Sequence, residues 1–352
     1  MKKITLIALL LSILISACKK DEIEREDNSE LFQAIVENIS NNVILKTYKD
    51  LSEKGNLLSS ALKELELNKT EANLEAARNA WIAARSPWEQ SEGFLFGPVD
   101  QEGIDPNIDS WPVNVTDLNY VLSSPNPITV DFLERQDETL KGFHTIEFLL
   151  WGENGDKTIA QFTKEQFQYL ASSAVLLSND LNKLYDLWKP EGGNYINQAI
   201  TAGNGSTIYR SQKSVIEEFS NAIAGIADEV GNGKINDPLT QNNFTLEESR
   251  FSNNSKNDFA DNMRSIQNIY LGKYLQNGNG NGLYKIIETT KPEVHQKIKK
   301  EIEDAISKIE NIPGTFTEAL NNNKAAIQDA QTAVRDLQET LESELIPYIS
   351  NL

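Results

Sequence analysis

The sequence predicts an all-α protein in which two antiparallel helical bundles pack side by side. Apolar residues recur three and four positions apart along most of the chain, as they do on the buried face of a helix. The period of two that marks half-buried strands is not evident in the sequence. A stretch rich in Gly and Asn, Pro190–Thr207, divides the helical segments into two groups and indicates the boundary between the bundles.

The first group of helices is predicted at Leu31–Tyr48, Leu57–Leu67, Thr70–Glu89, Val130–Trp151 and Thr163–Trp188. The last begins with a capping-box pattern, Thr163 followed by Gln166, whose side chains satisfy free N–H groups of the first turn. Pro87 should kink or end its helix, because proline lacks the backbone donor and crowds the preceding turn. The stretch Gly93–Thr129 is predicted to be non-helical, since it is rich in Pro, Gly, Asn and Asp.

The second group is predicted at Ser211–Val230, Ser255–Gln276, Pro292–Glu310 and Glu318–Leu345. Pro292 suits the first position of a helix, and Ile312-Pro313-Gly314 is typical of a stop followed by a turn. The predicted domains are therefore an N-terminal bundle over residues 30–195 and a C-terminal bundle over residues 205–352.

The N-terminus is typical of an exported lipoprotein. Two lysines precede an apolar run, residues 4–15, that is shorter than the roughly 20 residues needed to span a bilayer. This pattern predicts a signal peptide at residues 1–17. The run ends in Ile15-Ser16-Ala17-Cys18, which resembles a lipobox, so we expect Cys18 to carry the lipid and residues 18–29 to form a charged tether. The protein would then be anchored in the cell envelope at the outer membrane, on its periplasmic or its surface face.

Composition excludes several classes of function. The formal net charge of −19 and the pI of about 4.6 exclude a nucleic-acid partner, which requires a basic face. The only cysteine is Cys18, so no disulfide forms within one chain. A nucleophile motif of the Gly-x-Ser-x-Gly type, a phosphate loop and a dinucleotide fingerprint are all missing. Among enzymes, only a metal-dependent one is compatible with this sequence.

The sharpest candidate site is His144 with Glu147. Residues three apart project from nearly the same side of a helix, and Trp151 follows one turn later. Their neighbours are large and apolar, so this polar pair is predicted to be buried, and burial requires a partner or a metal. The other histidine, His295, lies in a charged segment and is interpreted as structural.

These residues carry a resemblance to a known family. Gly142-x-His144-x-x-Glu147 matches the GxHxxE motif of the imelysin-like proteins, an envelope group classed with metallopeptidases and linked to iron uptake. Further segments resemble the family in the right order: Trp81-x-x-x-Arg85-x-Pro87-Trp88-Glu89, Phe96-Gly97-Pro98, Asp109-Ser110-Trp111-Pro112, Glu248-Ser249-Arg250-Phe251-Ser252, Asp258, Asn262 and Tyr270-Leu271-Gly272. The resemblance implies two helical bundles with the marked residues gathered between them.

The candidate site residues follow from this resemblance. The predicted metal ligands are His144, Glu147, Glu89 and Glu248. The predicted ligand-binding residues are Arg85, Trp88, Trp151, Ser249, Ser252, Asp258 and Asn262. A different interpretation makes Arg85 and Glu89 a surface ion pair of little energetic value, and makes the Ser and Asn residues helix caps.

Three functions are compatible with these residues. The protein binds a metal ion, iron or zinc, or an iron chelate for uptake, and passes it to an envelope transport partner. Alternatively, it is a metallopeptidase in which Glu147 is the catalytic residue, although a single His-x-x-Glu lacks the second histidine of known zinc motifs. In the third case His144 and Glu147 form a structural pair, and the protein binds an organic ligand or a partner without metal.

Overall fold

The computed structural model describes residues 28–352, whose regular elements are all helices, with no β-strand among them, as predicted. The predicted signal peptide and the lipidation site Cys18 lie outside these residues. The helices of the first half are α1 (Ser29–Ile39), α2 (Leu45–Leu67), α3 (Glu71–Glu89), α4 (Pro98–Gln101), α5 (Ile104–Asp109), α6 (Val115–Ser123), α7 (Val130–Glu134), α8 (Gly142–Trp151), α9 (Lys164–Trp188) and α10 (Ile196–Ile200). Those of the second half are α11 (Gln212–Glu229), α12 (Asn236–Gln241), α13 (Ser255–Leu271), α14 (Pro292–Glu310), α15 (Phe316–Asn322), α16 (Lys324–Thr340) and α17 (Ile346–Asn351). Within the described part, none of these helices is both long and apolar enough to cross a membrane.

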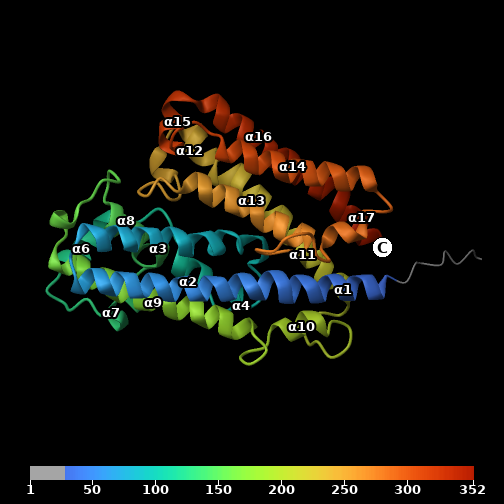
Figure 1. Ribbon diagram of the computed structural model, residues 1–352, viewed down its shortest axis with the longest axis horizontal. Coiled ribbons are helices and arrows are strands. Elements are labelled where there is room, and N and C mark those ends of the chain that lie inside the picture. Colours follow the sequence, from blue (N-terminus) through green and yellow to red (C-terminus); the bar gives the residue numbers. More distant parts are fainter. Residues whose placement is uncertain (1–27) are drawn as a thin grey trace, which may run out of the picture.

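The long helices pack into two layers. In the first half, α2 packs along both α3 and α9, and α8 packs against α3 and α9. In the second half, α14 packs against α13 and α16, and α11 packs against α13 and α16. Figure 1 shows α13, α14 and α16 in one layer, above the layer of α2, α3 and α9. The layers meet where α13 crosses α3 and where α1 contacts α11.

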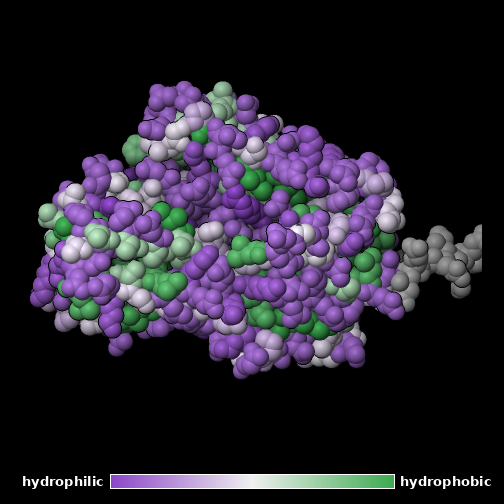
Figure 2. All heavy atoms as spheres, in the orientation of Figure 1, coloured by the Kyte–Doolittle hydropathy of each residue, from purple (hydrophilic) through white to green (hydrophobic). Residues whose placement is uncertain are grey.

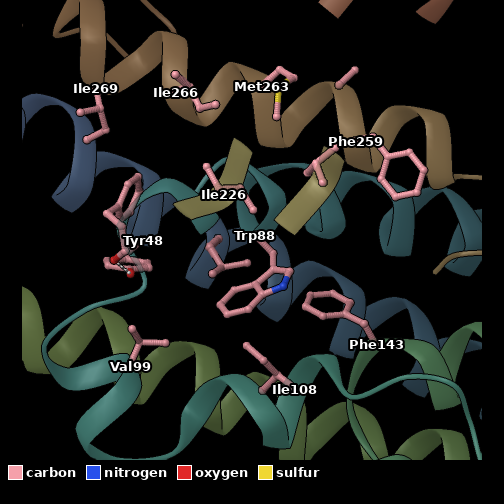
Figure 3. Packing of buried hydrophobic residues seen from close by; sticks show 14 of the residues in the cluster. Tyr48, Trp88, Val99, Ile108, Phe143, Ile226, Phe259, Met263, Ile266 and Ile269 are labelled. Carbon is pink, nitrogen blue, oxygen red and sulfur yellow. Dashed lines mark hydrogen bonds between the residues drawn. The ribbon is translucent and has the colours of Figure 1, made fainter. Parts of the chain in front are cut away.

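A shared hydrophobic core joins the layers. Trp88 of α3 is completely buried, and Figure 3 shows its indole between Phe143 of α8, Ile226 of α11 and Ile108 of α5. Full burial of a side chain of this size stabilises the fold by about 3 kcal/mol or more. Figure 2 shows that the outer surface over both layers is mostly hydrophilic, with only scattered apolar patches. The polar residues of α3 near Trp88 are therefore held inside the molecule, between elements of both halves.

Several local predictions are confirmed. The capping box at Thr163 begins α9 with both reciprocal hydrogen bonds, and Pro292 occupies the start of α14. The segment after Glu310 turns before α15, as the Pro-Gly pair predicts. Helix α3 contains Pro87 and ends two residues later, at Glu89.

Other local predictions are wrong in instructive ways. The segment Gly93–Thr129, predicted to be non-helical, contains the short helices α4, α5 and α6. Helices as short as these have too few residues for a hydrophobic period to be recognised in a sequence. The predicted helices at Leu31–Tyr48 and Leu57–Leu67 are confirmed, but the structure joins them in one continuous helical run, in which a π-helical turn, Ser40–Ile44, connects α1 to α2.

The predicted helix at Val130–Trp151 is interrupted after Glu134, and Gly142 determines where α8 begins. Its φ of +76° lies in the left-handed region, and a Cβ at this position would come within 2.3 Å of the carbonyl oxygen of Ile108. Only glycine tolerates both conditions. Helix α8 therefore begins at Gly142 in close contact with α5, which brings His144 next to Asp109 at the end of α5.

Candidate metal centre

Arg85 of α3 is surrounded by carboxylates although it is fully buried. Its Nη2 atom lies 2.5 Å from Glu89 Oε1 and 2.9 Å from Glu248 Oε1. Its Nη1 atom donates to Asp109, and its Nε atom lies 3.6 Å from Asp258 Oδ1. Acidic groups from α3, α5, α13 and the segment that precedes α13 thus meet around one guanidinium group. A buried charge requires such partners, because loss of hydration is costly for each ion.

His144, in the first turn of α8, has a carboxylate on each side of its ring. Its Nδ1 atom lies 3.1 Å from Glu147 Oε2, and its Nε2 atom lies 3.2 Å from Asp109 Oδ1. Ser252 donates its backbone N–H and its hydroxyl to Glu147 Oε1 at 2.8 and 2.7 Å. Glu147 is therefore fixed behind the imidazole. Carboxylates in this position commonly set the tautomer and orientation of a metal-binding histidine.

Asp109 connects the histidine to the arginine. Its Oδ2 atom accepts a hydrogen bond from Trp88 Nε1 at 2.7 Å, while Oδ1 faces both Arg85 and His144. His144 Nε2 makes no hydrogen bond of good geometry within the described chain. The ring therefore presents a buried nitrogen lone pair or N–H toward the carboxylates without a well-aligned partner.

Lys234 enters the same region from the second half of the chain. Its Nζ atom donates to Glu92 Oε2 at 2.8 Å and to Glu248 Oε1 at 2.9 Å, and lies 3.7 Å from Glu89 Oε2. Asn262 of α13 donates to the same two α3-side carboxylates, to Glu89 Oε2 at 2.6 Å and to Glu92 Oε2 at 3.0 Å. The two layers are therefore joined here by charge-assisted hydrogen bonds.

Six buried carboxylates meet in this region, which we call the acidic centre: Glu89, Glu92, Asp109, Glu147, Glu248 and Asp258. Its two permanent cations are Arg85 and Lys234, so the carboxylates outnumber them by four when all are ionised. Such an excess of buried negative charge needs protons or an additional cation to be stable.

Burial controls the protonation of three of these carboxyl groups. Loss of hydration raises the pKa of Glu89 and Glu92 well above the usual range. Arg85 and Lys234 offset this only in part at Glu89, and Lys234 offsets it only in part at Glu92. The same cause raises the pKa of Asp258 to about 7. These groups take up protons in the absence of another positive charge.

In contrast, the pKa values of Asp109 and His144 favour the charged form of each group. Burial alone would raise the pKa of Asp109, but the charge of Arg85 and the contact with His144 outweigh burial and hold that pKa well below its usual range. Burial and the charge of Arg85 lower the pKa of His144, yet its close contact with the charged Asp109 and its hydrogen bond with Glu147 prevail and raise the pKa to about 9. In the metal-free protein, His144 and Asp109 therefore form an ion pair near neutral pH.

A cavity of about 230 Å³ adjoins the acidic centre. Its walls include His144 and Glu248, together with the Trp111 ring and Arg250. Glu248 Oε2 is buried and has no hydrogen-bond partner in the described chain. The cavity thus reaches two of the potential ligand groups, His144 and Glu248.

The structure places most of the predicted site residues in or beside the acidic centre. Arg85, Trp88, Glu89, His144, Glu147, Glu248, Ser252, Asp258 and Asn262 make the contacts given above, and Ser249 is completely buried next to Asp258. Trp151 lies elsewhere, because its ring packs against Trp81 at 5.3 Å and beneath Arg78 at 5.5 Å. Arg85 and Glu89 form a buried pair, so the interpretation as a surface ion pair is wrong.

Sequence reasoning missed three members of the centre: Asp109, Glu92 and Lys234. Asp109 stands in one of the segments that resembled the family, and that segment was the available signal. Glu92 and Lys234 lie in Gly-containing turns that look solvated in the sequence. Their burial results from the packing of the two layers, which no local pattern reveals.

The fold and the site define a class: an all-helical protein with a buried histidine and carboxylate centre between two helical layers. A family model, Peptidase_M75 or Imelysin, matches residues 44–343. The chain therefore belongs to the imelysin family, as the GxHxxE resemblance implies.

Relatives agree with this assignment. Iron-regulated protein A of Synechococcus elongatus is 28% identical over 311 residues, which cover 87% of this chain and 84% of that protein. A crystal structure described as a putative iron-regulated protein A precursor from Parabacteroides distasonis superposes with a TM-score of 0.84 at 25% identity, and covers 93% of this chain and 97% of that one. An imelysin-like protein from Psychrobacter arcticum shares the fold, with a TM-score of 0.74 at 15% identity and coverage of 91% and 96%.

Proposed function

We propose that this protein binds a metal ion, with iron as the first candidate, through Asp109, His144 and Glu248. One observation carries the proposal. His144 Nε2 is buried without a well-aligned hydrogen bond, and ligand atoms of all three residues lie within 4.8 Å of one another. Imidazole with carboxylates is a ligand set that suits iron and other transition metals. The names of the iron-regulated relatives support the choice of iron.

The charge of the acidic centre supports a cation as the ligand. With six carboxylates and two permanent cations, a divalent ion would replace the protons that burial otherwise imposes on Glu89, Glu92 and Asp258. Glu147 supports the ion indirectly, because it is bonded to His144 Nδ1 and to Ser252.

The size of the cavity favours a metal ion over an iron chelate. Pockets for drug-sized molecules usually enclose roughly 300–1,000 Å³, whereas the cavity beside His144 and Glu248 encloses about 230 Å³. An ion with a few waters or a small anion fits this space. A multidentate organic chelator of iron does not, unless the two layers separate.

The contacts of Glu147 favour binding over peptide hydrolysis. A metallopeptidase needs a general base that is within reach of the attacking water. Glu147 Oε1 accepts two hydrogen bonds from Ser252, and Oε2 faces His144. Neither carboxylate oxygen is free for that role.

The cellular setting is part of the proposal. The lipobox-like sequence at Cys18 supports a lipid anchor in the cell envelope, at the outer membrane, where the protein would capture metal and deliver it to a transport partner. Replacement of Cys18 by Ala should abolish labelling by radioactive palmitate. Labelling of the Cys18→Ala chain would contradict the anchor.

Metal titration tests the central proposal. The chain that follows the predicted signal peptide, with Cys18→Ser, would be titrated with Fe²⁺ under anaerobic conditions and with Zn²⁺, by calorimetry and elemental analysis. One ion per chain is expected in this protein, and none after His144→Ala. His295→Ala is the matched control, because it removes the only other histidine, which pairs with Tyr270 on α13. Folded proteins that bind neither ion would refute the proposal.

A further inference from the structure

Two overlapping ligand groups share part of the acidic centre. One consists of Asp109, His144 and Glu248, and the other consists of Glu89, Glu92, Asp109 and Glu248. In each group the ligand atoms lie within 4.8 Å of one another. Asp109 and Glu248 belong to both groups. Shared carboxylates of this kind bridge the ions of two-metal centres, which are about 3.5–4 Å apart.

The second group already contacts two positive charges. Arg85 pairs with Glu89, Asp109 and Glu248, of which Asp109 and Glu248 also belong to the group beside His144. The other positive charge, Lys234, is the one that also contacts Glu92. Lys234 Nζ lies 2.8 Å from Glu92, 2.9 Å from Glu248 and 3.7 Å from Glu89, so it contacts three of the four members. The Lys234 side chain is almost completely buried, and its ammonium group lies 5.4 Å from the centre of the Trp111 ring. The ammonium group thus occupies the space between these carboxylates.

The backbone holds Lys234 in this position. The π-helical turn Val230–Lys234 follows α11, and Ile235 donates its N–H to Val230 O at 3.0 Å to close the wide turn. Gln331 of α16 donates to Gly231 O at 2.8 Å and fixes the outer side of the turn. The extra residue in a π-helical turn changes the direction of the side chains that follow. Here Lys234 extends into the acidic centre from a turn that is anchored on the opposite side.

We infer that Lys234 is a tethered cation that fills the second metal position, so that the centre binds one ion, next to His144. This inference rests on the proposed function of the acidic centre as a metal site. An ammonium group and a metal ion cannot occupy the same position between Glu89, Glu92 and Glu248, because their like charges repel strongly in a buried site. The lysine therefore sets the number of ions bound.

Lys234→Met tests the inference, because methionine keeps an unbranched apolar stem and removes the charge. The probes are Fe²⁺ under anaerobic conditions and Zn²⁺, with the number of bound ions measured by elemental analysis and calorimetry. Wild type is expected to bind one ion per chain, and Lys234→Met two. Lys157→Met is the matched control, because Lys157 is also a buried lysine but donates to Leu149 O and Gln166. It should bind one ion.

The outcomes separate this inference from the proposed function. If wild type binds one ion and folded Lys234→Met also binds one, the inference is wrong and the proposed function stands. If wild type binds none and Lys234→Met binds one, the proposed function is wrong, and the inference that rests on it is wrong as well. If wild type binds two ions, or if neither protein binds any, the inference is wrong.

A second variant tests the same inference if Lys234→Met does not fold. The double variant Lys234→Met and Glu92→Gln removes one carboxylate together with the ammonium group, and so keeps the net charge of the centre. The amide that replaces the Glu92 carboxylate retains an oxygen ligand, and Glu89, Asp109 and Glu248 remain. The double variant is expected to bind a second ion with an affinity reduced about tenfold or more relative to the first. A single ion at saturating metal concentration would overturn the inference.

Discussion

Glu147 lies behind His144, with its Oε2 atom 3.1 Å from Nδ1, whereas Nε2 faces the carboxylates of the acidic centre. The two residues are three apart on α8, so the helix itself brings them together. Ser252 then fixes the far oxygen of the carboxylate. The GxHxxE motif in this protein thus directs one ring nitrogen of the histidine toward the acidic centre and supplies one carboxylate that orients the ring.

Replacement of Glu147 should weaken metal binding without abolishing it. Loss of a carboxylate that orients a ligand histidine typically costs roughly 10- to 100-fold in metal affinity. Glu147→Gln is therefore expected to raise the dissociation constant for Fe²⁺ by about that factor, while His144→Ala abolishes binding. Calorimetric titration measures both. Glu165→Gln, on the partly exposed first turn of α9, is the control, and a complete loss of binding in Glu147→Gln would make Glu147 a direct ligand.

Arg85 should be the most important single charge for stability of the metal-free protein. It is fully buried and contacts four carboxylates, and removing one partner of a buried ion pair costs about 3–5 kcal/mol. Arg85→Met is expected to lower the free energy of unfolding by at least about that amount, as measured by urea denaturation with circular dichroism.

Arg264→Met provides the comparison for Arg85→Met. Arg264 pairs with Asp261 and Glu310 but is about one-third exposed. Such surface pairs contribute about 0–1 kcal/mol. Equal losses of stability in the two variants would show that the acidic centre does not depend on Arg85.

The helical fold was predictable because its signal extends over many residues. In α9, for example, apolar positions repeat along a helix of 25 residues and a capping box marks the start, so the prediction and the structure agree to within one residue. The short helices between Gly93 and Thr129 were not predictable, because segments as short as α4 and α5 carry too little periodicity. The π-helical turns at Ser40–Ile44 and Val230–Lys234 have no known sequence pattern to reveal them.

The site was predictable only in part, for a similar reason. His144 and Glu147 share one helix, so their contact follows from helical spacing. The contacts of Arg85 with Glu248 and of Asn262 with Glu89 join residues 163 and 173 positions apart. Only the resemblance to the imelysin family suggested that they meet. Lys234 belongs to no motif that the sequence reveals, and its burial follows from packing, in which Gln331 of α16 holds the turn through Gly231 O.

Lys157 should make stability depend on pH. Burial, with a smaller effect of Arg78, lowers the pKa of Lys157 to about 7. The unfolded lysine keeps its proton up to its ordinary pKa of 10.5, so between these values the unfolded state binds more protons and stability rises with pH. From pH 7 to 9, wild type should gain about 2 kcal/mol relative to Lys157→Met, measured by urea denaturation at each pH. The difference from the variant cancels the titration of other groups, and a constant difference would contradict the lowered pKa.

Gly142→Ala should disrupt both the fold and the site, and Gly103→Ala separates the two causes of the damage. Both glycines have positive φ, +76° and +58°, which costs about 1 kcal/mol or more for alanine. A Cβ at Gly103 meets nothing within 4 Å, whereas at Gly142 it would lie 2.3 Å from Ile108 O. Relief of that overlap requires α8 to move away from α5, which carries His144 away from Asp109.

We therefore expect Gly103→Ala to lower the free energy of unfolding by about 1 kcal/mol, measured by urea denaturation, with unchanged Fe²⁺ affinity. Gly142→Ala should lose about 3 kcal/mol and bind Fe²⁺ at least about tenfold more weakly. Equal behaviour of the two variants would show that the approach of α8 to α5 does not position the histidine.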